Sequence, residues 1–234
     1  MTNDRLQRVL ETEAMDTAAE AIGYNTMDHA EVNRRFVDDL LALVPDVRQV
    51  VDLGTGTALI PIELCMRHSG AHVVGVDMAE SMLAVGRENI ARAGDAHAGA
   101  SHGNLAERIE LAWADAKRLP YGDGKFTLVI SNSIVHHIPE PLGMLSEAVR
   151  VLAPGGKLLV RDLLRPADSE TVTGLVDTYA AGANPQQRQM FDDSLRAALD
   201  LDEIRSLVSS LGFDTQAVRA TSDRHWTWSA EKPR

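Results

Sequence analysis

The stretch "QVVDLGTGTALIPIELC", residues 49–65, joins a short apolar strand to a glycine turn and an apolar helix. Asp52 stands just before Gly54 and Gly56, and Pro61 falls in the first helical turn, where its missing N–H does no harm. Because crevices open at the carboxyl ends of parallel strands, a glycine turn at this place is suited to bind a ligand. The stretch therefore predicts an α/β fold with a ligand at the turn.

Further runs rich in valine, isoleucine and leucine continue the pattern along the chain. The predicted strands after the first cover residues 71–77, 108–113, 126–131 and 157–162, and the predicted helices cover 58–69, 80–93 and 141–152. The strands at 71–77, 126–131 and 157–162 have the apolar runs expected of strands buried on both faces of a parallel sheet. Near the C-terminus, "TQAVRAT" and "HWTWS" alternate in polarity, which predicts a closing antiparallel hairpin. The fold class is therefore α/β, a doubly wound, Rossmann-like sheet.

We expect a single domain over residues 1–234, made of one core with helical additions. Its expected parts are an N-terminal helical cap at 1–44, a cofactor-binding core at 45–166, a helical lid insertion at 167–198, and a closing helix and hairpin at 199–234. Within the cap, residues 4–21 and 28–44 have helical patterns. The glycines of "LAPGG" (152–156) are free to take positive φ, so this segment is predicted to end a helix and turn the chain into a strand.

Composition narrows the functional classes. The formal net charge of −11 disfavours broad binding to nucleic acid or to an anionic membrane. The N-terminus is polar and acidic, unlike a secretory signal, and no apolar run approaches ~18 residues. Cys65 is the only cysteine, so an intramolecular disulfide is impossible and a buried, inert thiol is expected. We expect a cytoplasmic, soluble protein.

The residues around the turn indicate which ligand it holds. The dinucleotide fingerprint requires a third glycine where Leu59 stands, and Asp52 would repel a pyrophosphate but attract an ammonium group. Asp77 ends the second strand about 20 residues beyond Gly56. A carboxylate at this position can accept hydrogen bonds from the hydroxyls of a ribose. An amino group, a ribose and no phosphate together describe S-adenosylmethionine.

Four motifs in order resemble those of class I S-adenosylmethionine-dependent methyltransferases, most of all the ubiquinone/menaquinone-biosynthesis-like small-molecule branch. They are "VDLGTGTA", "VVGVDMAESML", "WADAKRLPYGDGKFTLVISNSIVHHI" and "EAVRVLAPGGKLLVRDLLRP", within residues 48–166. The resemblance implies a seven-stranded sheet whose last strand is antiparallel. It also implies a cofactor-binding set of Asp52, Gly54, Gly56, Asp77, Met78, Asp115, Ala116, Ser131 and Asn132. Asp77 and Asp115 are also suited to cap the segments that follow them.

Candidates for the chemistry lie after the fourth and fifth strands and in the N-terminal region. His136 is the better candidate for a general base, since the resemblance favours His137 as support for the loop. The expected substrate-side residues are Tyr24, His29, Asp162 and Arg165. An alternative role for Tyr24 is to attach a helix to the core. The alternative for Arg165 is that it lies in an ordinary surface turn and binds no substrate. Positioning of the reactants alone can also supply much of the rate.

The sequence favours a small organic methyl acceptor and no catalytic metal. A magnesium site would need acids after both the fourth and fifth strands, where Asn132 is a poor partner for Asp162. A single thiol is too few for the several that arsenite methylation needs in the resembling family. Two alternatives stay open: an enzyme on this fold that uses S-adenosylmethionine without methylating, and a catalytically silent binding protein.

Overall fold

The computed structural model describes residues 5–11, 16–96 and 104–234, and its contacts divide the chain into two compact units. The larger unit comprises residues 14–132, 143–159 and 230–234, and the smaller unit comprises residues 1–13, 133–142 and 160–229. Among the described residues, no helix is both long and apolar enough to cross a membrane.

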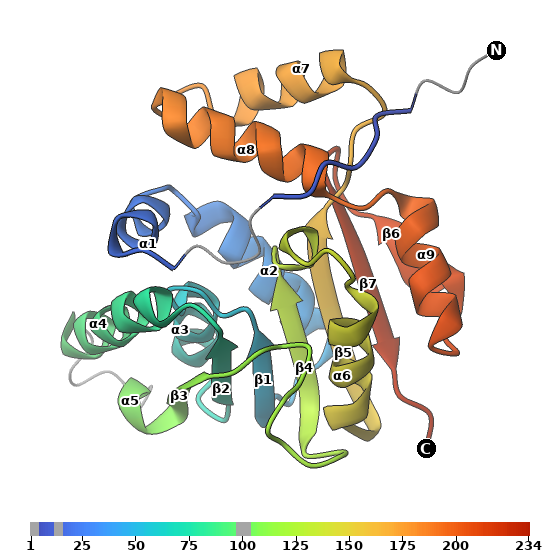
Figure 1. The fold of residues 1–234 in the computed structure, drawn as a ribbon. Coiled ribbons are helices and arrows are strands. Elements are labelled where there is room, and N and C mark those ends of the chain that lie inside the picture. The colour runs from blue at the N-terminus through green and yellow to red at the C-terminus, as the bar shows by residue number, and fades with distance from the viewer. Residues whose placement is uncertain (1–4, 12–15, 97–103) are drawn as a thin grey trace. The chain divides into compact units, whose positions relative to one another are not determined.

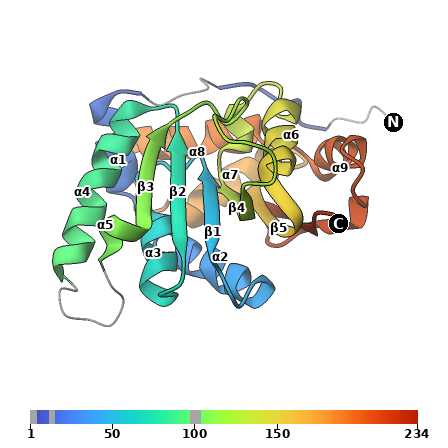
Figure 2. The same ribbon diagram turned by 90° about the horizontal axis from the view of Figure 1, so that it is seen from below.

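The strands form a seven-stranded sheet in the order β3-β2-β1-β4-β5-β7-β6. Their bounds are β1 Gln49–Leu53, β2 His72–Asp77, β3 Ile109–Trp113, β4 Phe126–Asn132, β5 Leu152–Leu163, β6 Val218–Ala220 and β7 His225–Glu231. β1 pairs in parallel with β2 and β4, and β6 pairs antiparallel with β7. The predicted α/β sheet with its closing hairpin is confirmed, and Figure 2 shows β3, β2 and β1 side by side.

The strand register brings the carboxyl ends of β1, β2, β3 and β4 to one edge of the larger unit. Leu53 of β1 is level with Val76 of β2 and with Ser131 of β4, and Asp77 of β2 is level with Trp113 of β3. The residues directly after these strands therefore share one edge, as the rule for parallel sheets requires.

Helices connect the parallel strands of the larger unit and bury its core (Figure 1). Their bounds are α1 Ala18–Asn25, α2 Ala30–Leu43, α3 Leu59–Arg67, α4 Glu80–Ala96, α5 Leu105–Arg108 and α6 Leu142–Val151, which begins at the unit boundary. Phe36 and Leu40 of α2 pack with Leu64 of α3, Val50 of β1 and Ile90 of α4 in a single buried cluster. Because α2 and α3 carry their apolar residues on one face, burying that face fixes both helices.

The smaller unit carries the C-terminal helices. Its elements include the 3-10 turn η1 Val135–His137, the helices α7 Ser169–Tyr179, α8 Pro185–Ala197 and α9 Leu201–Ser210, and the 3-10 turn η2 Thr215–Ala217. Sequence-local caps set the helix starts: Asp168 caps α7, and Asn184 and Asp200 form capping boxes on α8 and α9. α7 and α8 lie against each other, as Figure 1 also shows. The predicted helical block and the closing helix are confirmed.

Two predictions for single elements were wrong. Residues 5–11 are not helical, because their backbone bonds distant segments: Leu6 N–H donates to Ala167 O and Val9 N–H to Arg196 O. The fifth strand begins at Leu152, so "LAPGG" belongs to it. Gly155 has φ +76°, but Gly156 is required for close approach: a Cβ there would lie 2.8 Å from Ala153 O.

Candidate functional site

The glycine turn after β1 is held in a left-handed conformation that glycine accommodates best. Gly54 and Gly56 have φ values of 71° and 53°. The N–H groups of Gly54 and Thr55 both donate to Val76 O, at 2.9 and 3.0 Å, which fastens the turn to the end of β2. Ala58, also at positive φ, then begins α3. The turn is therefore a rigid backbone cradle.

Asp77 at the end of β2 completes the cradle. Its Oδ2 accepts from Gly56 N–H at 2.8 Å, and its Oδ1 accepts from Ala79 N–H at 2.9 Å, directly before α4. Asp77 therefore also caps the segment that leads into α4, the alternative role expected from the sequence. Each carboxylate oxygen has two lone pairs, so Asp77 retains the capacity to accept hydrogen bonds from a ligand.

Asp52 lies behind the turn, almost completely removed from solvent at 2% exposure. Burial raises the pKa of Asp52 to about 7, and the negative charge of Asp77 acts in the same direction. A buried carboxyl that ionises near neutrality carries a negative charge at higher pH. It is therefore suited to stabilise a cationic group of a ligand.

Tyr24 and His29 lie beside this turn within the larger unit. A Cβ at Gly56 would lie 4.0 Å from Tyr24 Cε1, and burial together with the charges of Asp77 and Asp52 raises the pKa of Tyr24 to about 12. His29 stacks on the Tyr24 ring, with centroids 4.4 Å apart, and its Nε2–H donates to Tyr24 O at 3.0 Å. Burial lowers the pKa of His29, so the neutral ring supports Tyr24.

Trp113 was missed by the sequence analysis. It is 62% exposed at the end of β3, and its Nε1–H donates to Met78 O at 2.8 Å. The sequence signal for it is a large aromatic residue at the carboxyl end of a predicted strand, but its exposure is a property of the folded chain alone. Trp113 thus fixes the backbone of Met78, a residue of the predicted cofactor-binding set.

Asp115 and Ala116 form a turn that follows β3. Asp115 Oδ1 accepts from Lys117 N–H at 2.8 Å and lies 3.1 Å from the Lys117 ammonium. Asp115 therefore caps a turn and not a helix, while the adjoining Ala114 N–H donates to Asp77 O at 3.0 Å. These bonds join the segment after β3 to the segment after β2.

The last two predicted cofactor residues, at the end of β4, differ in their surroundings. Ser131 is fully buried and donates to Leu53 O at 2.9 Å, so its hydroxyl links β4 to β1 and does not line an opening. Asn132 Oδ1 is buried and, among the described residues, has no hydrogen-bond partner. A buried orphan acceptor at a predicted ligand site is what a donor group of a ligand would satisfy.

His136 in the smaller unit is not an accessible base. It is 3% exposed, its Nδ1 is 2.5 Å from Asp162 Oδ1, and its Nε2 is 3.5 Å from Glu11 Oε1. Burial alone would lower the pKa of His136, but the charges of Asp162 and Glu11 outweigh burial and raise it. The expected assignment of His136 to substrate and His137 to loop support is therefore not what the geometry favours.

The side chains of the two histidines lie close together. They lie in the 3-10 turn η1, with ring centroids 4.1 Å apart, and His137 Nδ1 is 3.0 Å from the same Glu11 oxygen. The tight turn and the shared carboxylate bring both rings to one side. Glu11 is a residue that the sequence analysis missed, since nothing local marks it.

Asp162 and Arg165, predicted on the substrate side, have structural partners instead. Asp162 is fully buried and also accepts from the N–H groups of Val135 and Leu163, at 2.5 and 2.6 Å. Arg165 is only 9% exposed, so the surface-turn alternative is wrong as well.

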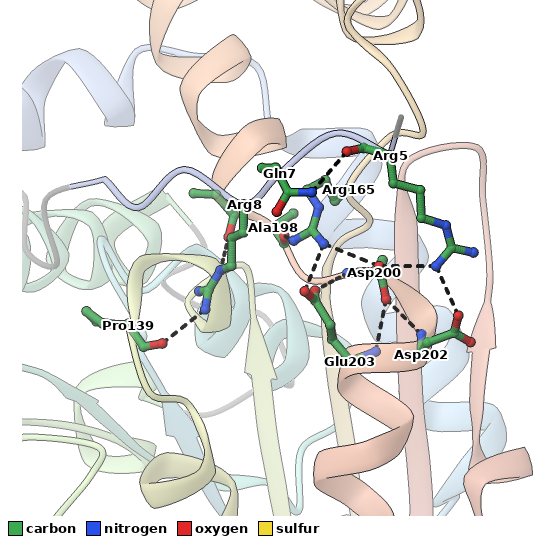
Figure 3. A network of polar contacts seen from close by, with 10 residues as sticks. Arg5, Gln7, Arg8, Pro139, Arg165, Ala198, Asp200, Asp202 and Glu203 are labelled. Atoms are coloured by element: carbon green, nitrogen blue, oxygen red, sulfur yellow. Dashed lines mark hydrogen bonds and ion pairs between the residues drawn. The ribbon is translucent and has the colours of Figure 1, made fainter. Parts of the chain in front are cut away.

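Arg165 is a buried member of a network of polar contacts that Figure 3 shows from close by. Its guanidinium donates to Ala198 O at 2.8 Å, to Asp200 Oδ2 at 3.3 Å and to Glu203 Oε1 at 2.8 Å. The two terminal nitrogens of the Arg165 guanidinium thus already donate to groups of this chain, where a substrate carboxylate would need them. Arg165 therefore stabilises the start of α9.

Comparisons with known proteins agree on one family. Residues 51–160 match the family described as a methyltransferase domain. The arsenite methyltransferase of Halobacterium salinarum is 29% identical over 221 residues, covering 89% of this chain and 49% of that protein. The demethylmenaquinone methyltransferase of Clavibacter sepedonicus is 30% identical over 175 residues, covering 70% of this chain and 65% of that protein. The chain thus spans less than two thirds of the length of these relatives.

A solved structure supports the fold over nearly the whole chain. It is a candidate S-adenosyl-L-methionine-dependent methyltransferase from Methanococcus maripaludis, with a TM-score of 0.70 at 14% identity, covering 97% of this chain and 98% of that chain. At this identity the likeness concerns the fold alone.

Proposed function

Because the chain belongs to the class I S-adenosylmethionine-dependent methyltransferases, we propose that it transfers a methyl group to a small organic acceptor. The observation that carries this proposal is the cradle of Gly54, Gly56 and Asp77 with Asp52 buried behind it. It offers backbone and carboxylate groups suited to an ammonium and to hydroxyls, and it lacks the third glycine of a pyrophosphate site.

The residues present fit the donor that the family uses. Asp52 and the glycine turn would hold the methionine end, and Asp77 would accept from the ribose. Met78, Asp115, Ala116 and the exposed Trp113 would surround the adenine. Asn132, with its orphan Oδ1, would accept from a donor of the ligand. Bound there, S-adenosylmethionine supplies an electrophilic methyl group on a sulfonium.

No side chain in the predicted catalytic set is poised as a general base, which favours catalysis by positioning. His136 is buried between two carboxylates, and Asp162 holds its Nδ1. Orienting an acceptor against a methyl donor at near-attack distance can contribute ~7–11 kcal/mol to lowering the barrier. The chain's residues would then bind, orient and exclude water, while the acceptor supplies its own nucleophile.

An organic acceptor fits this chain better than arsenite does. The only thiol is Cys65, which is fully buried, and burial raises its pKa to about 11. Such a thiol is protonated at neutral pH and inaccessible to a metalloid. The related demethylmenaquinone methyltransferases support the choice of a small organic molecule. We further propose that residues 1–44 and 167–198, which lie outside the cofactor motifs, determine which acceptor is bound.

The test is an acceptor screen with methyl-labelled S-adenosylmethionine and fractionated small-molecule extract. The proposal expects label in an organic product, equimolar S-adenosylhomocysteine, and loss of both in the Asp77→Ala variant. Binding of the donor without labelled product, but with conversion of another compound, would favour a non-methylating enzyme. Absence of donor binding would overturn the proposal altogether.

A further inference from the structure

A second group of reactive side chains lies in the smaller unit, outside the proposed cofactor-binding set. Glu11 Oε1 is 3.0 Å from His137 Nδ1 and 3.5 Å from His136 Nε2. The three ligand atoms all lie within 4.8 Å of one another. The two adjacent imidazoles therefore lie close to a carboxylate from a distant part of the chain.

His136 has the hydrogen bond that orients a metal-binding imidazole. Asp162 accepts two backbone N–H bonds, so it is a fixed carboxylate, and it holds His136 Nδ1 at 2.5 Å. A carboxylate on one ring nitrogen fixes the tautomer, and it directs the lone pair of the other nitrogen outward. Here that other nitrogen, Nε2, faces Glu11.

His137 supplies an independent observation. Its Nδ1 is buried and, among the described residues, makes no hydrogen bond of acceptable geometry, although Glu11 Oε1 is 3.0 Å away. Two atoms bound to one ion at ~2.1 Å lie about 3.0 Å apart at right angles and about 3.4 Å apart in a tetrahedron. The separations of Glu11 Oε1 from the two ring nitrogens, 3.0 and 3.5 Å, are close to these values. The third separation, between the two ring nitrogens, is within 4.8 Å, so ion binding would draw the two imidazoles together.

We propose that Glu11, His136 and His137 bind one divalent transition-metal ion, with Zn²⁺ the best match, and that Asp162 positions His136. Imidazole ligands favour zinc and its neighbours over Mg²⁺ or Ca²⁺, which prefer oxygen. The local charges agree, because the carboxylates of Glu11 and Asp162 both act on His136 and are opposed there by the guanidinium of Arg8.

The ion would have a structural role, fastening residues 5–11 to the loop after β4. Arg8 already donates to Pro139 O at 3.0 Å, as Figure 3 shows. It also donates to Ile138 O at 2.9 Å and to Ala197 O at 2.7 Å. Ser194 donates to Glu11 Oε1 at 3.2 Å. The expectation of no metal rested only on the acids after the fourth and fifth strands. Glu11 reaches the site from the N-terminal segment instead.

The experiment measures metal binding directly and needs no methyl donor, so it is independent of the proposed function. The full chain, freed of metal by chelator and dialysis, is titrated with Zn²⁺ by calorimetry and with Co²⁺ by visible absorption. The proposal expects one ion per chain, a Co²⁺ absorption band, and a higher unfolding temperature with Zn²⁺. Glu11→Gln and His137→Asn should each weaken binding at least tenfold.

The control is His68→Asn, which changes a histidine of the larger unit whose Nε2 bonds Pro45 O, and it should bind like the wild type. Glu11 and His137 are partly exposed, so circular dichroism and urea unfolding of the metal-free variants can verify that both fold. Absence of binding, or equal affinity in the wild type and Glu11→Gln, would overturn the proposal. The cluster would then be an ion pair held by a proton.

Discussion

Replacing Asp77 by asparagine tests the cofactor cradle most directly. The carboxylate bridges two backbone groups, because Oδ2 accepts from Gly56 N–H at 2.8 Å and Oδ1 accepts from Ala79 N–H at 2.9 Å. Asparagine keeps one acceptor, so only one of the two N–H groups remains satisfied. The other then faces an NH₂ group, and a ribose bound as we propose would lose its charged acceptor.

The expected magnitude follows from counting these bonds. A hydrogen bond to a charged acceptor contributes about 1.5–3 kcal/mol, so losing one backbone bond should lower the free energy of unfolding by about that amount. In the proposed binding mode, S-adenosylhomocysteine would also lose hydrogen bonds from its ribose to this charged acceptor. Since 1.4 kcal/mol is tenfold in affinity, S-adenosylhomocysteine should bind the Asp77→Asn variant about 10- to 100-fold more weakly.

Two assays separate the structural role of Asp77 from its ligand role. Calorimetric titration with S-adenosylhomocysteine gives the affinity, and urea unfolding without ligand gives the stability. Asp38→Asn is the matched control, because Asp38 is an exposed acid that pairs with Arg67 at 2.5 Å. If Asp77→Asn lowers stability but binds the ligand like the wild type, Asp77 is a cap alone and the ribose assignment fails.

Three further predictions concern other residues. With the pKa of Asp52 raised to about 7, affinity for S-adenosylhomocysteine should fall roughly tenfold per pH unit as pH drops below 7 and level off above it. Calorimetry across pH checks this, and Asp52→Asn should remove the dependence; an equal slope in the variant would assign it elsewhere. Trp113→Ala should weaken binding about tenfold with little loss of stability, because the side chain is 62% exposed; unchanged affinity would exclude Trp113 from the adenine side. Arg165→Met should lower the free energy of unfolding by about 1–3 kcal/mol, since Asp200 and Glu203 lose a buried partner; a change in donor affinity instead would contradict its structural role.

The sequence was sufficient for those features that depend on local order. Strand and helix periods, the glycine turn and the closing hairpin are all properties of short segments, because backbone torsions and side-chain periodicity are local. The spacing of Asp77 from Gly56 also carries tertiary information, since the carboxyl ends of parallel strands share one edge. These features predicted the sheet, and they predicted the residues of the cradle as a ligand site.

Tertiary structure alone decided the roles of the charged residues in the smaller unit. His136 is buried because Asp162 and Glu11 reach it from distant segments, and Arg165 is buried by the start of α9. Residues 5–11 are not helical, because the N–H groups of Leu6 and Val9 find partners on other segments. Contacts between residues so far apart in the chain produce no periodic pattern in the sequence. A local pattern can therefore name a histidine or an arginine as a candidate, but packing determines whether it faces solvent or another side chain.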